Sequence, residues 1–226
     1  MNRFVYAQLL DSALPIGGFS HSFGLESAVQ QGSVATLEDV KQYIRAMLHL
    51  SWAPVDVLAV KAVYVYGEHD AWGRVWQIDE LQHVGRAAME SREGMLKMGR
   101  RFMKLMMAMH PHLSWERLVQ AIRVGDCPGT YPTIFGYAAY ELGFSLDEAA
   151  EGYLYTCITL CVNAALRLLS VGQTESQVML TTLLPEIASA WQSVCTWEPE
   201  SFASSAPVMD YYMMHHETLY SRLFMS

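Results

Sequence analysis

The side chains best able to do chemistry are eight histidines and four cysteines. Only His110–His112 and His215–His216 bring imidazoles close together in the sequence, and Cys157 and Cys161 lie one helical turn apart. A zinc-type site needs three or four ligands at regular spacing, and the sequence after His216 lacks the second histidine of an HExxH pattern. We expect no metal site of the chain's own, and we interpret the cysteine pair as small core side chains. Transient ligation by His215 or His216 stays open.

A second candidate for chemistry is the segment Gly18–Gly24, which holds Ser20 beside His21. Its spacing does not match the GxSxG nucleophile turn, no strand precedes it, and adjacent side chains do not easily form a nucleophile–base hydrogen bond. The glycine-rich phosphate-binding patterns are also absent from the sequence. We therefore expect a turn followed by a helix cap, no catalytic residue and no cofactor.

Arg167 lies inside the apolar run Tyr153–Val171. The run is close to the length that spans a bilayer, but Asn163 and Arg167 interrupt it and no second such run exists. The sequence therefore favours a core helix and no membrane span. For Arg167 we favour an ion pair with an acidic residue of a neighbouring helix, and an arginine finger acting on a partner is the alternative.

The C-terminal residues 208–226 are unusually apolar, with four methionines, three tyrosines, two leucines and Phe224. Burying one such large side chain gains about 1.5–3 kcal/mol, so leaving all of them in water is unfavourable. The tail must dock either on its own core or on another protein. It follows Trp197–Pro207, which is rich in proline and serine and predicts a flexible linker. Its expected interface anchors are Tyr211, Tyr212, Leu219, Leu223 and Phe224.

The bulk composition limits the classes of function. The chain has 226 residues, is 52% hydrophobic and 17% charged, and carries a net charge of −8. Its only basic cluster, Lys97–Lys104, is short, so we expect no nucleic-acid binding. Four scattered cysteines predict no disulfide framework, and the first residues show no signal-peptide pattern, so we expect a cytoplasmic protein.

Almost every segment has helical periodicity, with glycine and proline between segments. Thr36–Asp39, Ser145–Glu148 and Thr174–Gln177 have the pattern of capping boxes. No period-2 strand pattern or internal repeat is found. We predict an all-α protein, a single multi-helix bundle-like domain over residues 1–205, with a tail over 206–226. The expected helices cover 4–10, 22–30, 36–48, 54–66, 70–83, 89–109, 114–125, 132–142, 145–171 and 174 onward, the last kinked or restarted at Pro185.

Four blocks of the sequence resemble the UreF family of urease accessory proteins. They are Leu9–Glu26, Glu90–Phe102, Tyr153–Gln173 and Ala206–Ser226, which are similar to the family's "LxxxSPALPVGGFSYSxGLE", "ERxxSxxxG", "RLxxxGQ" and "PxxD…HExxxSRLFxS" patterns. Their order and spacing extend along the whole chain. One departure is Thr130, which stands where the family often has histidine, so no metal or proton role of that histidine carries over.

The resemblance implies an all-helical, non-enzymatic adapter in urease maturation. Such proteins dimerise, bind the scaffold UreD (also called UreH), recruit the GTPase UreG and assemble on the urease apoprotein, where nickel is inserted. Residues 1–35 and the tail would contact the scaffold. The residues that the resemblance and the tail composition assign to partner binding are Leu14, Pro15, Gly17, Phe19, Ser20, Glu26, Arg167, Gly172, Gln173, Asp210, Tyr212, His216, Glu217, Arg222, Leu223 and Phe224.

Two alternatives to a passive adapter remain. The chain would activate GTP hydrolysis by UreG if Arg167 or Arg222 acted as an arginine finger. It would carry nickel itself if His215, His216 or the cysteines bound the ion tightly. The sequence also leaves open how the two copies of a dimer pack and which surface meets the GTPase.

Overall fold

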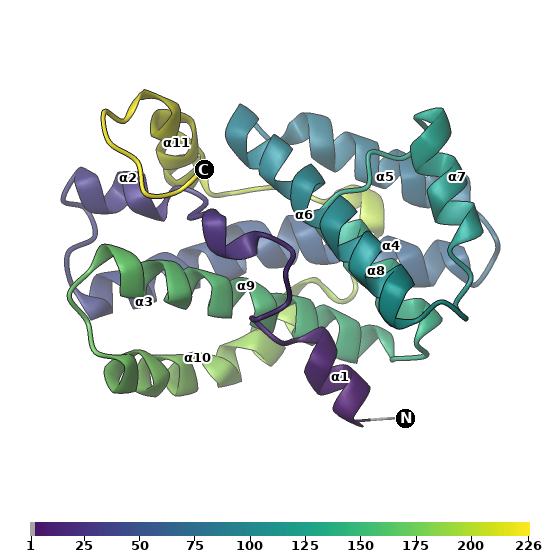
Figure 1. Ribbon diagram of the computed structural model, residues 1–226, viewed down its shortest axis with the longest axis horizontal. Coiled ribbons are helices and arrows are strands. Elements are labelled where there is room, and N and C mark those ends of the chain that lie inside the picture. Colours follow the sequence, from purple (N-terminus) through teal and green to yellow (C-terminus); the bar gives the residue numbers. More distant parts are fainter. Residues whose placement is uncertain (1–2) are drawn as a thin grey trace.

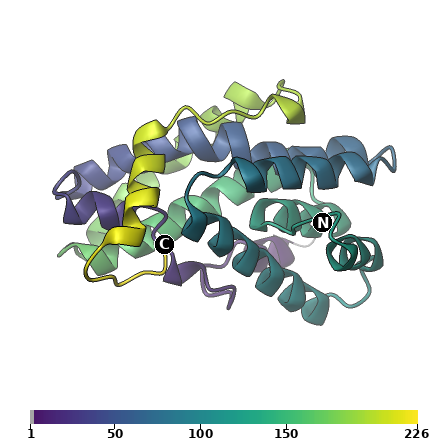
Figure 2. The ribbon, with the colours of Figure 1, turned by 90° about the horizontal axis from the view of Figure 1, so that it is seen from above.

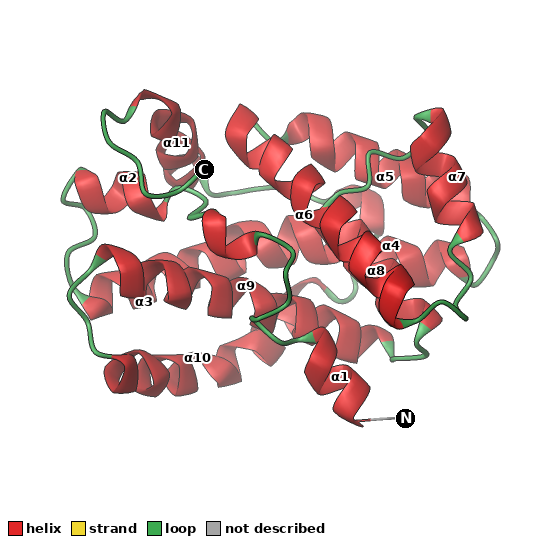
Figure 3. Ribbon diagram, viewed as in Figure 1, coloured by secondary structure: helices red, strands yellow, loops and turns green. Residues whose placement is uncertain are grey.

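The computed structural model describes residues 3–226, and these residues form helices and connecting segments without a strand (Figure 3). The all-α prediction is confirmed. Figure 1 shows the N-terminal helix at one end of the molecule and the C-terminus near the other, beside α2. The α-helices are α1 (Arg3–Leu9), α2 (Leu25–Gln30), α3 (Leu37–Met47), α4 (Val57–Gly67), α5 (Trp72–Gly85), α6 (Met89–Met109), α7 (Glu116–Val124), α8 (Tyr131–Glu141), α9 (Leu146–Leu168), α10 (Gln173–Val194) and α11 (Pro207–His215).

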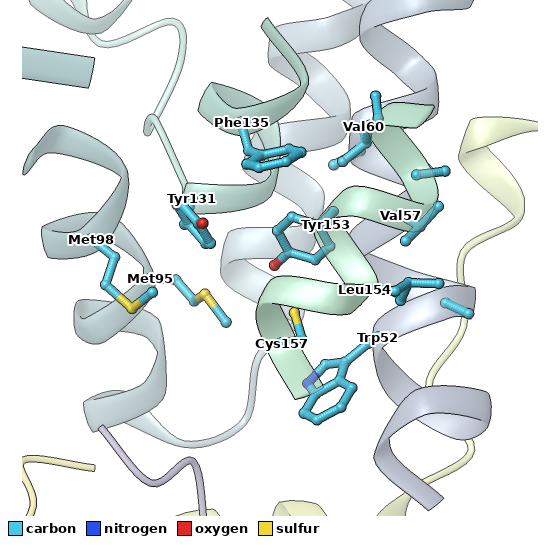
Figure 4. Close-up of a cluster of buried hydrophobic side chains, with 14 of the residues drawn as sticks. Trp52, Val57, Val60, Met95, Met98, Tyr131, Phe135, Tyr153, Leu154 and Cys157 are labelled. Carbon is cyan, nitrogen blue, oxygen red and sulfur yellow. The ribbon is translucent and has the colours of Figure 1, made fainter. Parts of the chain in front are cut away.

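The core lies where α4, α8 and α9 meet, with α6 packed on the outer side of α8. Phe135 and Tyr153 are fully buried, and their rings meet edge to face with centroids 5.5 Å apart. Figure 4 shows side chains from α4, α6, α8 and α9 pointing into one cluster. Aromatic residues of this kind bury large areas and add specific ring contacts, so they dominate the energy of the core.

Two of the three expected capping boxes form at the predicted residues. Thr36 Oγ1 accepts from the Asp39 amide at 3.2 Å, and Ser145 Oγ accepts from the Glu148 amide at 3.3 Å. The third capping box, predicted at Thr174–Gln177, was wrong by two residues. The helix α10 begins at Gln173, and the Gly172 amide donates to the Glu175 side chain at 3.0 Å. These caps satisfy amides that the first turn of a helix leaves without partners.

Proline positions misled the prediction at Pro54. Pro54 was expected to begin a helix, but it lies inside a π-helical segment, Leu48–Asp56, that joins α3 to α4 without a break. Pro185 lies within α10, so the helix does not restart there, and the kink expected at Pro185 stays a prediction. A π-helical segment accommodates an irregularity in the hydrogen-bond ladder, so a buried proline is tolerated when neighbouring groups take up the freed carbonyls.

The helical run Leu37–Gly67 is long and apolar enough to cross a membrane by length and composition, and 78% of its most apolar 18-residue window is buried inside the protein. It therefore behaves as a core helix. The sequence analysis considered only Tyr153–Val171, so its expectation that no second such run exists was wrong. Tyr153–Leu168 of that run belong to α9, which is also a core helix, with Tyr153 and Leu154 fully buried.

The segment 197–207, predicted to be a flexible linker, is fastened to the helical body. Lys61 Nζ donates to the carbonyls of Cys195 and Trp197 at 2.7 and 2.5 Å. The amides of Ala203 and Ser205 donate to carbonyls in the π-helical segment at 3.1 and 2.9 Å. Composition alone missed this, because the partners are backbone carbonyls whose availability depends on the irregular helix beside them.

Candidate partner-docking site at the C-terminal segment

Glu26, near the start of α2, is the centre of the contact between the tail and the rest of the chain. Its side chain is 2% exposed and accepts hydrogen bonds from the backbone amides of Leu223 and Phe224 at 2.6 and 3.0 Å. It also lies 3.0 Å from Nε2 of His216. A buried carboxylate is stable only when such donors compensate for its lost hydration, so the tail and Glu26 depend on each other.

His216 is fully buried between two carboxylates. Its Nδ1 lies 2.6 Å from Glu90 of α6, opposite the contact with Glu26. Both nitrogens of the ring therefore lie within hydrogen-bonding distance of a carboxylate oxygen. Arg222 also donates to Glu90 at 2.6 Å. His216 and Arg222 of the tail thus face the carboxylates of Glu26 and Glu90.

The last residue is held by the loop that precedes α2. The Ser226 backbone oxygen accepts from the amides of Ser22 and Phe23 at 2.6 and 3.1 Å and from the Ser22 hydroxyl at 2.8 Å. Phe23 has φ 48°, and Gly24 has φ 91° and approaches the backbone nitrogen of Met213. A left-handed turn of this kind points successive amides at one acceptor.

Arg167, at the end of α9, joins the N-terminal loop to the tail. Its Nη1 donates to the Phe19 carbonyl at 2.7 Å, and its guanidinium lies 4.3 Å from the Phe224 ring centroid and 4.9 Å from that of Phe19. The expected ion pair with an acidic residue is wrong within residues 3–226, where Arg167 meets a carbonyl and two aromatic rings. A planar cation suits this role because it stacks on rings while its edge donates hydrogen bonds.

Burial also sets the titration of the groups beneath the tail. Burial first, and then the nearby charges of Lys97 and Arg101, lowers the pKa of His21 to about 4, and its Nδ1 lies 2.7 Å from the Ser226 hydroxyl. Burial raises the pKa of Cys161 to about 12 and that of Cys157 well above its ordinary value. Protonated thiols are poor metal ligands, and residues 3–226 contain no cluster of three groups placed to hold an ion.

The structure gathers most of the predicted partner-binding residues at one place, where the tail crosses α2 and the N-terminal loop. Glu26, Arg167, His216, Arg222 and the 223–224 backbone are directly connected as described above. Ser20 joins them, because its carbonyl accepts from the Met225 amide at 2.8 Å. Leu14, Pro15, Gly17 and Phe19 line a separate hollow of the loop before α2, beside Arg101, and of these Phe19 is linked to the tail through Arg167.

The remaining predicted residues have separate positions. Gly172 and Gln173 form the start of α10 and make no contact with the tail among the described residues. Asp210 and Tyr212 lie half-buried on α11, and burial raises the pKa of Asp210. Glu217 is exposed in the short 3-10 turn after α11 and has no hydrogen-bond or ion-pair partner within residues 3–226.

Sequence reasoning missed three participants. They are His21, Glu90 and Ser226, which contact residues more than 100 positions away in the chain. His21 was considered only as a nucleophile's neighbour, and Glu90 only as the first letter of a family pattern. No spacing rule connects such distant residues. The one usable signal was Glu90 itself, a carboxylate in the first turn of the methionine-rich helix α6.

The tail has two faces of different character. One face, with Met213, His216 and Phe224, is buried against the body. The other leaves large apolar side chains in water, which is unusual for a segment already packed on its own protein. These exposed side chains are Val208, Tyr211, Met214, Tyr220, Leu223 and Met225. The tail therefore docks on its own core and still presents an apolar surface.

Comparison with known proteins gives a consistent result. A model of the UreF family matches residues 34–184. The chain is 30% identical over 219 residues to a urease accessory protein UreF of Actinobacillus pleuropneumoniae serotype 3, covering 96% of both chains. It is 30% identical over 231 residues to the UreF of Bacillus sp. strain TB-90, covering 100% of both. The two relatives match over the helical body and the tail together, and the chain belongs to the UreF family of urease accessory proteins.

Proposed function

We propose that this protein is a cytoplasmic adapter in urease maturation that binds the scaffold UreD/UreH through its tail and N-terminal loop. As a dimer it presents the helical body to the GTPase UreG and brings both to the urease apoprotein for nickel insertion. The observation that carries the proposal is the two-faced tail. Its inner face is fixed by Glu26 and His216, and its outer face offers Tyr220, Leu223 and Met225 to a partner.

The geometry supports an adapter more than a finger-type activator. Arg222 donates a hydrogen bond to Glu90, and Arg167 contacts Phe19 and Phe224. Both guanidinium groups therefore make structural contacts within the free chain. An adapter needs no reacting group of its own. It transmits information if the GTP-bound and GDP-bound states of its partner differ in affinity for the assembled surface.

The experiment uses point substitutions in place of truncation. A chain stopped at Ser205 would leave the buried Glu26 without its donors, so a loss of binding could reflect a loosened body. We suggest Leu223→Asp combined with Tyr220→Asp, since both side chains point into solvent and their exposed fractions are 51% and 106%. The control is Val124→Asp on α7, with a similar exposed fraction of 55%.

Each purified variant is mixed with the scaffold and analysed by size-exclusion chromatography with light scattering. The tail variant should lose the complex while keeping its melting temperature, and the Val124→Asp variant should bind like the wild type. Unchanged scaffold binding by the tail variant would reject the docking role. A GTP-turnover assay with UreG then separates adapter from activator, because an arginine finger predicts that Arg→Ala abolishes a stimulation of about a thousandfold or more.

A further inference from the structure

The outward face of α6 carries a row of positive charges. Lys97, Arg100, Arg101 and Lys104 are all exposed, and their spacing of three, four and seven residues places them on one side of the helix. The opposite side, which includes Phe102, is buried against α8. Figure 1 shows α6 at the front of the molecule. We call these four residues the basic stripe.

The described part of the chain leaves the basic stripe almost without counter-charge. Residues 94–115 contain no aspartate or glutamate, although the protein as a whole has a net charge of −8. Lys97 pairs with Glu93 at 2.8 Å, and within residues 3–226 no carboxylate lies within 4.0 Å of Arg100, Arg101 or Lys104. Like charges three or four residues apart on a helix repel each other and destabilise it. The stripe therefore lowers the stability of the free protein.

The stripe adjoins the apolar loop before α2. The guanidinium of Arg101 lies against the backbone of Gly17, so close that a side chain at position 17 would collide with it. Gly17 also has φ 84°, a conformation that favours glycine. A surface hollow is lined by Leu14, Pro15, Phe19 and Arg101 together with neighbouring loop residues. The side chain of Phe19 is 65% exposed. Figure 2 shows α6 along the lower edge of the molecule, beside the loop.

We propose that the basic stripe and this loop together form a docking surface for an acidic segment of a partner protein, with an apolar side chain of that segment against Phe19. The proposal rests on the adapter function and names the chemistry of one of its partner surfaces. Arginine and lysine pair with carboxylates, and the partner's charges remove the repulsion along α6. The contact therefore stabilises the complex and relieves a cost in the free chain.

A protein segment fits this surface better than a nucleic acid. The stripe spans seven residues of helix, about 10 Å, and ends at an apolar loop. A longer polyanion would extend beyond the stripe over a protein whose net charge of −8 repels it. A short acidic segment with one apolar residue matches both the length and the composition of the surface.

The test reverses the charge of the stripe while leaving its packing alone. The variant is Arg100→Glu with Lys104→Glu, both exposed, and a milder version uses Gln at both positions. The matched control is Lys41→Glu with Arg123→Glu, which changes the net charge equally at sites on α3 and α7 outside the stripe. Phe19→Ser tests the apolar half. Purified UreD/UreH scaffold, UreG and urease apoprotein are the probes, each titrated singly against the full-length chain at two salt concentrations.

The stripe variant should bind at least one of the three probes about tenfold or more weakly, with a shallower salt dependence, and Phe19→Ser should weaken the same complex. The control should stay within about threefold of the wild type, because its charges lie far from the surface. Equal melting temperatures exclude misfolding, and the Gln version should have an intermediate affinity.

Three results would overturn the proposal. One is unchanged binding of all three probes by the stripe variant. Another is loss of self-association by that variant without any probe, which would make a second copy of the chain the occupant. The third is binding of a short RNA or DNA duplex at physiological salt as tightly as any protein probe. If the wild type binds none of the probes, the adapter function itself fails, and that result is distinct from a failure of the stripe alone.

Discussion

The core at α4, α8 and α9 and the junction between the tail and the body are stabilised by different forces. Core residues such as Phe135 and Tyr153 exclude water with aromatic and aliphatic surface. The junction depends on hydrogen bonds and charges that converge on Glu26, His216 and Glu90. Apolar packing resists pH and salt, whereas a charged junction responds to both. The protein thus combines an apolar core with a junction whose stability depends on hydrogen bonds and charges.

The largest effect should come from breaking the core. Phe135→Ala removes a fully buried ring that stacks on Phe102 with centroids 5.9 Å apart. We expect a loss of about 3–5 kcal/mol in the free energy of unfolding, because a cavity remains where the ring was. Urea denaturation followed by circular dichroism measures it. A loss below about 1 kcal/mol would mean that the core adapts freely and is not the rigid half of the molecule.

Breaking the junction should have a smaller and more local effect. Glu26→Ala leaves the amides of Leu223 and Phe224 and the ring of His216 without their acceptor. We expect a global loss of about 2–3 kcal/mol, limited because the freed tail can reach water. Hydrogen exchange followed by mass spectrometry should show faster exchange in residues 216–226 than in α8. Glu26→Gln keeps one carbonyl acceptor and is the matched control. Equal protection of the tail in all three proteins would refute the role of Glu26.

The pH dependence sharpens the comparison. Because burial lowers the pKa of His21 from 6.5 to about 4, the unfolded chain binds this proton more readily than the folded one. Stability from His21 is present above pH 6.5 and is lost as pH falls toward 4, by on the order of 2 kcal/mol between pH 7 and pH 5. Lys97, Arg101, His216 and Glu90 also act on this ring. Urea midpoints at several pH values give the slope.

His21→Gln isolates that effect from the titration of the other groups at the junction. The variant should lose part of the pH slope of the wild type between pH 7 and pH 5, since glutamine cannot take up a proton. The variant should therefore gain stability relative to the wild type as the pH falls from 7 to 4. Identical slopes would show that His21 titrates normally and that other groups cause the acid sensitivity.

The smallest effect should come from the connection between the two regions. Arg167→Ala removes a carbonyl hydrogen bond and the contacts with the rings of Phe19 and Phe224. Because Arg167 is exposed, we expect a loss of only about 0.5–1 kcal/mol, with Arg167→Lys intermediate. Thermal melts quantify it, and exchange at Phe224 reports it locally. A loss comparable to that of Phe135→Ala would place Arg167 in the core.

Local signals predicted the helices well and the irregular positions poorly. Met89–Met109 was predicted with the same bounds, and Ser145–Glu148 marked the start of α9, because periodicity and caps act within a few residues. Pro54 was misassigned since its cost depends on whether neighbours take up the carbonyl that it leaves free one turn earlier, as the Ser205 amide does for the Leu50 carbonyl at 2.9 Å. Ser205 lies 151 positions after Pro54 in the chain.

The sequence by itself determined that this chain is all-helical, that it belongs with the UreF proteins, and that its apolar ending needs a surface to cover it. Local periodicity, capping residues and side-chain hydrophobicity contain that information directly. Only the tertiary structure decided that the ending covers one face on Glu26 and leaves the other in water. It also decided that Arg167 meets rings rather than a carboxylate. These outcomes depend on which residues, distant in the sequence, lie together in the folded protein with matching donors and acceptors. No local sequence pattern contains that information.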